Sequence, residues 1–167
     1  MGLGSIVASG LVVLLMLVAV YALVGVTLTT AEVVATAQAE QTVHHETRMH
    51  TGITVLDAAR VNATSTVYVE VENTGSEPVT GNFSYMEVFL LQGNEISGYE
   101  TVRYPYGTSG YAWSIVEIAP DIVHPGMLDP DEVLNLSVHY DSSRGSPAWM
   151  KVTTPNGVSG STYLEDP

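Results

Sequence analysis

The sequence contains no cysteine, only five basic side chains among 167 residues, and no charged side chain before Glu32. Without cysteine the chain has no disulfide bonds and no thiolate metal sites, so its folded part depends on a hydrophobic core. Eighteen acidic residues give a net charge of −13. Binding to nucleic acid needs clustered Lys and Arg, and the five basic residues here are scattered singly, so we expect no nucleic-acid partner.

The charge-free start of the chain is its strongest signal. The apolar run that begins near Ile6 and continues past Val24 is as long as the roughly 20 residues that cross a bilayer as a helix. A secretory signal has a basic start and an apolar stretch of roughly 7 to 15 residues. No Lys or Arg precedes this run, and the run is longer. We therefore expect a retained membrane anchor, or a helix in a bundle whose interior excludes water as a membrane does.

Small side chains within this segment suit helix packing. Ser5 and Ser9 are four residues apart, and small residues at that spacing let helix backbones approach closely in lipid. The alternative is a lone anchor that tolerates them. The residues we expect to act in assembly or anchoring are Ser5, Ser9, Leu11, Leu14, Leu15, Val18, Ala22 and Gly25.

The helical pattern continues past the apolar segment. Residues 31–41 lack Gly and Pro and are rich in good helix formers, so the sequence predicts one helix of about 45 residues that ends by Gly52. At roughly 1.5 Å per residue such a helix spans about 65 Å, which is twice the hydrocarbon core of a membrane. We expect a transmembrane or assembly helix at residues 1–50 and a second domain at residues 51–167.

From Ile53 onward the pattern alternates with a period of two, which is typical of half-buried strands. Val67, Val69 and Val71 face one way, and the segment ends at Asn73-Thr74-Gly75, a turn in which Asn and Gly tolerate left-handed backbone angles. Six to eight short strands without helical interludes predict an immunoglobulin-like antiparallel β-sandwich, so the fold class is α+β. The other expected strands are residues 53–61, 82–91, 111–119, 133–140 and 149–153, with Leu134, Leu136 and Val138 on one face.

Catalytic and metal-binding patterns do not emerge from the sequence. The histidines at 44, 45 and 50 lack the spacing of a zinc helix, and no HExxH motif is present. The carboxylates at 129, 131 and 132 lack the spacing and glycine of a calcium loop. No nucleophile elbow surrounds a serine. We expect a non-enzymatic protein without metal or cofactor.

Two sets of residues are candidates for surface roles. Tyr and Trp concentrate at protein interfaces, although the aromatic residues of this loop could equally fold back on the sandwich. Asn-x-Ser/Thr sequons fit an exported, glycosylated domain. The aromatic set is Tyr99, Tyr104, Tyr106, Tyr111 and Trp113, and the sequons lie at Asn62, Asn82 and Asn135.

Three stretches carry family-like motifs. Met1-Gly2-Leu3-Gly4-Ser5 runs directly into the apolar helix without a basic leader, and residues 67–75 read VYVEVENTG, a V-x-V-x-N-T-G strand and turn. Residues 126–132 and 150–158 read GMLDPDE and MKVTTPNGV, similar to an L-x-P-G-E turn and a K-V-V-T-P-N-G-V strand. These stretches resemble the archaellum (archaeal flagellum) accessory proteins F and G, of the archaellin and type IV pilin-like superfamily. That family has a glycine where Asp131 stands, and residues 96–109 are longer and richer in Tyr than its pattern.

The resemblance implies a structural component of the archaellum or a related pilus-like filament, with its sandwich outside the cytoplasmic membrane. In one role it is a stationary, stator-like accessory whose helix sits in lipid and whose sandwich contacts the surface-layer protein. In the other it is the filament subunit, for motility or adhesion, whose helix joins copies of itself or related pilin-like subunits.

Overall fold

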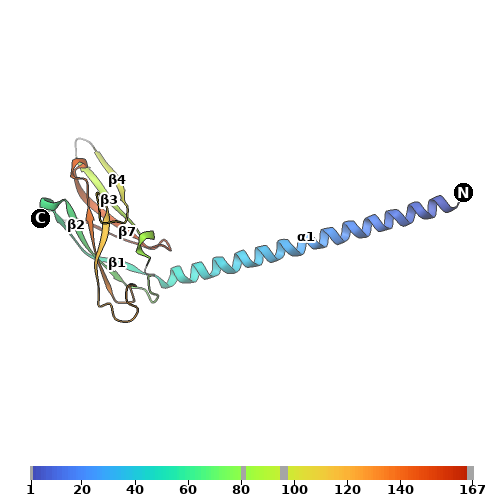
Figure 1. The fold of residues 1–167 in the computed structure, drawn as a ribbon, viewed down its shortest axis with the longest axis horizontal. Helices are drawn as coiled ribbons and strands as arrows, with labels where there is room; N and C mark the ends of the chain where they lie inside the picture. Colours follow the sequence, from blue (N-terminus) through green and yellow to red (C-terminus); the bar gives the residue numbers. More distant parts are fainter. Residues whose placement is uncertain (1, 80–81, 95–97, 165–167) are drawn as a thin grey trace. The chain divides into compact units, whose positions relative to one another are not determined.

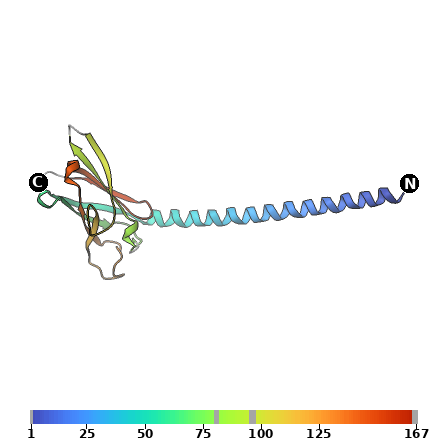
Figure 2. The same ribbon diagram turned by 45° about the horizontal axis from the view of Figure 1, so that its top comes forward.

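The computed structural model describes residues 2–79, 82–94 and 98–164, apart from the side chains of Leu3 and Ser5. It divides the chain into two units, residues 1–44 and residues 45–167. A single helix, α1 (Leu3–His50), runs unbroken through 48 residues (Figures 1 and 2). It contains no proline, which would remove a hydrogen bond and kink it. The predicted long helix ending before Gly52 is confirmed.

The second unit is a sandwich of two antiparallel four-stranded sheets, which confirms the predicted α+β class (Figure 1). One sheet has the order β1-β2-β6-β5 and the other β4-β3-β7-β8. The first sheet consists of β1 (Ile53–Val61), β2 (Thr66–Asn73), β6 (Val133–His139) and β5 (Trp113–Ala119). The second consists of β4 (Gly98–Tyr104), β3 (Glu87–Asn94), β7 (Ser146–Thr153) and β8 (Ser159–Tyr163).

The core between the sheets is built from alternating apolar residues, as the period of two predicts. Val67, Val69 and Val71 of β2 are at most 2% exposed, and they pair with β6. The buried partners on β6 are Leu134, Leu136 and Val138, and the other sheet contributes Val88, Leu90, Met150 and Val152. The predicted inward faces of β2 and β6 are therefore confirmed.

Other strand predictions need correction. The strand expected at residues 82–91 begins only at Glu87, because residues 83–85 form a 3-10 turn that buries Phe83 and so resembles a strand in the sequence pattern. The strand expected from residue 111 begins at Trp113. Strands β4 and β8 were not predicted, since β8 consists of small and polar residues and β4 exposes most of its side chains.

Candidate assembly surfaces

The apolar part of α1 presents hydrophobic side chains on every side. All side chains described in α1 are exposed, and its large apolar ones are 49–84% accessible. The helix is long and apolar enough to cross a membrane. A helix that is hydrophobic all round is stable in lipid or in the core of a bundle, not in water. The helix surface is thus the main candidate site of this chain.

Most of the predicted assembly residues lie on one stripe of this helix. By the period of 3.6 residues per turn, one face carries Leu11, Leu14, Leu15, Val18, Ala22 and Gly25. Ser9 lies on the opposite side, about 160° around the axis from Leu11. The side chain of Ser5 lies outside the described residues. The role of this stripe in assembly or anchoring stays a prediction.

Six hydroxyl side chains of α1 are hydrogen-bonded within the helix itself. The Ser9 hydroxyl donates to the Ile6 carbonyl at 2.9 Å, and the Thr30 hydroxyl donates to the Val26 carbonyl at 2.8 Å. Hydroxyls that bond the carbonyl three or four residues earlier remain satisfied without water. The same pattern holds for Thr27, Thr29, Thr36 and Thr42.

The glycines of the helix are not required by contacts within the chain. A Cβ atom placed on Gly4, Gly10 or Gly25 would have nothing within 4 Å. Glycine inside a helix costs about 1 kcal/mol relative to alanine. Their backbone is therefore left open on the helix surface, where another helix can approach.

The C-terminal end of α1 is held by the turn that follows β2. The His50 carbonyl accepts the amide hydrogens of Ser76 at 2.8 Å and Glu77 at 3.2 Å, and the Gly52 carbonyl accepts those of Thr74 and Gly75. The His50 ring nitrogen Nδ1 lies 3.0 Å from the Ser76 hydroxyl. Carbonyls at a helix C-terminus have no partner within the helix, so the turn caps them.

Asn73 fixes this turn from inside the sandwich. Its fully buried side-chain amide donates to the carbonyls of Leu128 at 2.9 Å and Glu77 at 3.0 Å, while its carbonyl oxygen accepts the Gly75 amide at 3.0 Å. Neither Asn73 nor Gly75 has the left-handed backbone expected from the sequence. The glycine is needed because a Cβ atom there would lie 2.4 Å from both the His50 oxygen and the Gly52 nitrogen.

The acidic turn that superficially suits calcium is a structural brace. The buried Glu132 carboxylate accepts the backbone amides of Asp129 at 3.0 Å and Ile122 at 3.3 Å. The buried Asp129 carboxylate accepts the His124 amide at 2.9 Å and contacts its ring nitrogen Nδ1 at 2.8 Å. The third member of the group, Asp131, has φ +65°, the left-handed region that favours the glycine of the family pattern.

The aromatic segment divides into buried and exposed residues. Tyr104 and Trp113 are 2% and 0% exposed, so the interface prediction is wrong for these two, whose rings complete the core instead. Tyr106 packs edge-on against Trp113 with ring centroids 4.8 Å apart, and Tyr111 stacks on His139. Tyr99, Tyr106 and Tyr111 remain about half exposed, and an interface there stays a prediction.

Tyr104 belongs to a buried polar network. Its hydroxyl hydrogen-bonds the Gln92 side-chain oxygen, and the Gln92 amide donates to the carbonyls of Asp141 at 3.1 Å and Gly145 at 3.0 Å. Burial raises the pKa of the Tyr104 hydroxyl. Hydrogen bonds from Ser143 lower the pKa of the Asp141 carboxyl. The network ties the end of β4 to the loop between β6 and β7.

The three sequons differ in accessibility. Asn62 and Asn82 are exposed and lie outside the regular strands, Asn62 as the first residue of one short 3-10 turn and Asn82 directly before another. Asn135 is half-buried in the middle of β6, and its amide donates to the Glu117 carboxylate at 3.2 Å. Among residues 2–79, 82–94 and 98–164, no three His, Asp or Glu side chains are grouped to hold a metal ion, and this includes the histidines near the end of α1.

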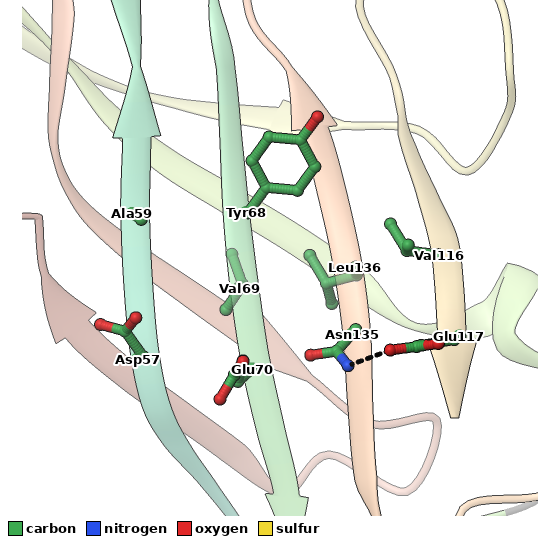
Figure 3. A pocket seen from close by; sticks show the side chains of 9 residues that line it. All are labelled: Asp57, Ala59, Tyr68, Val69, Glu70, Val116, Glu117, Asn135 and Leu136. Atoms are coloured by element: carbon green, nitrogen blue, oxygen red, sulfur yellow. Dashed lines mark hydrogen bonds between the residues drawn. The ribbon is translucent and has the colours of Figure 1, made fainter. Parts of the chain in front are cut away.

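An acidic row crosses the outer face of the β1-β2-β6-β5 sheet. Asp57, Glu70, Asn135 and Glu117 are paired across the four strands in register, and Figure 3 shows them side by side. In both edge strands the register shifts next to this row, so that an additional residue bulges outward. The bulged residues are Leu56 and Val116, which are 51% and 56% exposed.

A family model of archaeal-type flagellin matches residues 4–164, almost the entire chain. The chain belongs to the archaeal-type flagellin family. The resemblance of its N-terminal helix and strand motifs to the archaellin superfamily is thereby confirmed, and the protein is a structural component of the archaellum. None of the curated protein sequences matches this flagellin-family chain.

Three solved structures are similar to this flagellin-family chain. The archaellum periplasmic stator protein FlaG from Sulfolobus acidocaldarius is 16% identical, with a TM-score of 0.48 over 68% of this chain and 98% of that one. The archaellum periplasmic stator protein complex of FlaF and FlaG from the same organism is 16% identical, with a TM-score of 0.48 over 66% of this chain and 86% of that one. The archaeal flagellin FlaB1 from Methanocaldococcus jannaschii is 13% identical, with a TM-score of 0.46 over 68% of this chain and 88% of that one.

Proposed function

We propose that this flagellin-family chain is a filament subunit that assembles through α1 with copies of itself or related pilin-like subunits. The observation that carries the proposal is the length of the uncovered apolar helix surface. Residues 3–31 are free of charge, and at 1.5 Å per residue they span about 43 Å, against a hydrocarbon core of about 30 Å. Val33 and Val43 extend apolar exposure further along the helix. A bundle of like helices covers this whole length, whereas a bilayer covers only part of it.

The small residues of the helix support the same proposal. Among the residues that the structure describes, none would exclude a side chain at Gly4, Gly10 or Gly25, and these glycines weaken an isolated helix. In a dry bundle, small residues allow backbones to approach closely, which is the main source of helix association where hydrophobic burial gives none. In this role the sandwich lies outside the cytoplasmic membrane, on the exterior of the filament.

The second candidate is a stationary, stator-like accessory whose α1 remains in the membrane and whose sandwich contacts the surface-layer protein. It is favoured by the first half of the helix, which has the length and composition of a membrane span. In this role the residues that follow Ala31 form a stalk in water, and the exposed side chain of Val33 stays in water.

Electron microscopy of the purified full-length protein after removal of detergent tests the proposal. The filament role predicts helical fibres whose axial density contains the first 30 residues. Monomers or small oligomers that remain bound to detergent, with no fibres across a range of salt and protein concentrations, contradict the filament role and favour the anchored accessory.

A further inference from the structure

The two outer faces of the sandwich carry opposite kinds of side chain. On the β1-β2-β6-β5 face, the row of Asp57, Glu70 and Glu117 is joined by Glu72 one row away. Among the described residues that point outward from this sheet there is no Lys or Arg, because Arg60 turns the other way and donates to the Pro147 carbonyl at 2.9 Å. The described part of this face therefore holds four carboxylates with no Lys or Arg, and His139, opposite Thr66 near its end, is its one imidazole.

The outer face of the β4-β3-β7-β8 sheet is aromatic and basic. One row across it places Arg103, Phe89 and Lys151 side by side, between strand neighbours whose side chains fill the core. Arg103 is paired with Glu87 at 3.0 Å, whereas Lys151, the single lysine of the chain, has no acidic partner among the described residues. The next row carries Leu91, Trp149 and Tyr163, and Tyr163 is 77% exposed.

We infer that the acidic face of one copy docks on the aromatic and basic face of the next copy. The occupant is a second copy of this chain, because the two faces complement each other in charge within a molecule whose net charge is −13. The bulged Leu56 and Val116 give the acidic face two apolar contacts for the ring surface of Phe89 and Trp149. A contact between two different faces of the same molecule repeats head to tail, as a filament requires.

The contact rests on the proposed function, since assembly by α1 brings the copies together, and it deepens that function by naming the second surface that joins them. It also requires Asn135 to stay free of glycan, because Asn135 stands in the middle of the acidic row and its amide is bonded to Glu117. A glycan found on Asn135 in assembled protein would overturn the inference.

Cysteine cross-linking of the full chain tests the contact directly, because the natural sequence has no cysteine. In the variant that combines Glu70→Cys with Lys151→Cys, the two thiols point outward from different sheets, which pack about 10 Å apart. They cannot bridge within one copy, since a disulfide needs Cα atoms within about 7 Å. Mild oxidation of assembled protein is expected to give a ladder of dimers, trimers and larger species. Glu77→Cys combined with Lys151→Cys is the matched control and should give no ladder.

Charge reversal provides the second measurement. Lys151→Glu and Glu70→Lys are each expected to weaken self-association about tenfold, and an equal mixture of the two single variants should recover part of the loss through mixed contacts. Fibres that form normally but give no ladder overturn the face-to-face contact and leave the proposed function standing. Absence of fibres overturns the proposed function, and absence of the ladder in that case overturns the contact as well. A ladder of equal extent in the control variant that combines Glu77→Cys with Lys151→Cys also overturns the face-to-face contact.

Discussion

A Cβ atom on Gly75 would lie 2.4 Å from the carbonyl oxygen of His50, closer than side-chain carbons approach backbone atoms in proteins. This carbonyl ends α1 and accepts two amide hydrogens from the turn that contains Gly75. The Asn-Thr-Gly motif that resembles the archaellin superfamily is therefore a backbone clamp on the end of the helix.

Gly75→Ala is expected to destabilise the sandwich unit by about 2 to 3 kcal/mol, because the clash involves backbone atoms that cannot rotate away. Denaturant unfolding of the full-length protein in detergent, followed by fluorescence of the two tryptophans, measures the loss. Gly107→Ala is the matched control, since a Cβ there would meet only the Ala112 side chain at an ordinary 3.8 Å. Equal stability of the two variants would contradict the clamp.

The Asn73→Asp variant distinguishes the hydrogen bonds that the Asn73 side chain donates from the one that it accepts. The carboxylate still accepts the Gly75 amide, but it has no hydrogen to donate to the carbonyls of Leu128 and Glu77. The Glu77 carbonyl then loses this donor, while the Leu128 carbonyl keeps the Val79 amide at 2.9 Å. A buried carboxylate that faces two carbonyl oxygens costs more than the lost hydrogen bonds alone, so the Asn73→Asp variant should lose at least as much stability as Asn73→Ala. If Asn73→Asp unfolds like the natural protein, donation by the amide is not what fixes the turn.

Tyr104 makes the stability of the sandwich sensitive to alkali. Its raised pKa means that the folded protein keeps the phenol protonated where the unfolded chain ionises, near pH 10. Stability from this residue is therefore complete below pH 10 and is lost as the pH rises through the folded pKa. The free energy of unfolding, measured from about pH 8 to about pH 11.5, should decline with pH in the natural protein. This decline should be shallower in the Tyr104→Phe variant. Tyr163→Phe, at an exposed position, should keep the natural slope.

Leu15→Glu is expected to abolish assembly or membrane retention while the sandwich stays folded. The new carboxylate would stand in the charge-free part of α1, where burial of an unpaired charge costs several kcal/mol. Sedimentation and electron microscopy follow assembly, and tryptophan fluorescence follows the fold. Val123→Glu places the same charge at another exposed apolar position, in the loop braced by Glu132, and should assemble normally. An unfolded sandwich in Leu15→Glu would refute the two-part organisation.

Glycan attachment should follow the exposure of the sequons. We expect modification at Asn62 and Asn82, which are exposed outside the strands, and none at Asn135, whose amide is held by Glu117 within β6. Intact mass and peptide mapping of protein from the native host decide this, with Asn62→Gln and Asn82→Gln as controls for the mass shift. Full occupancy at Asn135 with empty Asn62 would contradict the structural ranking.

Local patterns account for much of the fold. The helix was predictable because residues 11–51 contain one glycine and no proline, and β2 and β6 were predictable because their inward residues are all aliphatic. The strands β4 and β8 lie at the edges of their sheet, where one partner strand and little burial stabilise them. Such strands need no apolar alternation, so the sequence carries no signal for them.

The candidate surfaces were predictable only in part. The helix stripe follows from spacing alone, since a helix fixes the direction of each side chain. The burial of Tyr104 and Trp113 depends on tertiary packing, in which Tyr104 of β4 pairs with β3 and Trp113 of β5 pairs with β6. The role of Gly75 likewise depends on His50, which lies 25 residues earlier, and no local pattern reports such a contact.

The hydroxyl groups along α1 have a consequence for how a subunit can move between environments. Each described bond of this kind joins a side chain to the carbonyl one turn earlier, so it is internal to the helix and independent of what lies outside. Transfer of the helix from lipid to a protein bundle therefore breaks none of them, and no water has to follow. In the proposed filament role, the apolar part of the helix can therefore pass from the membrane into a growing filament with all of these bonds intact.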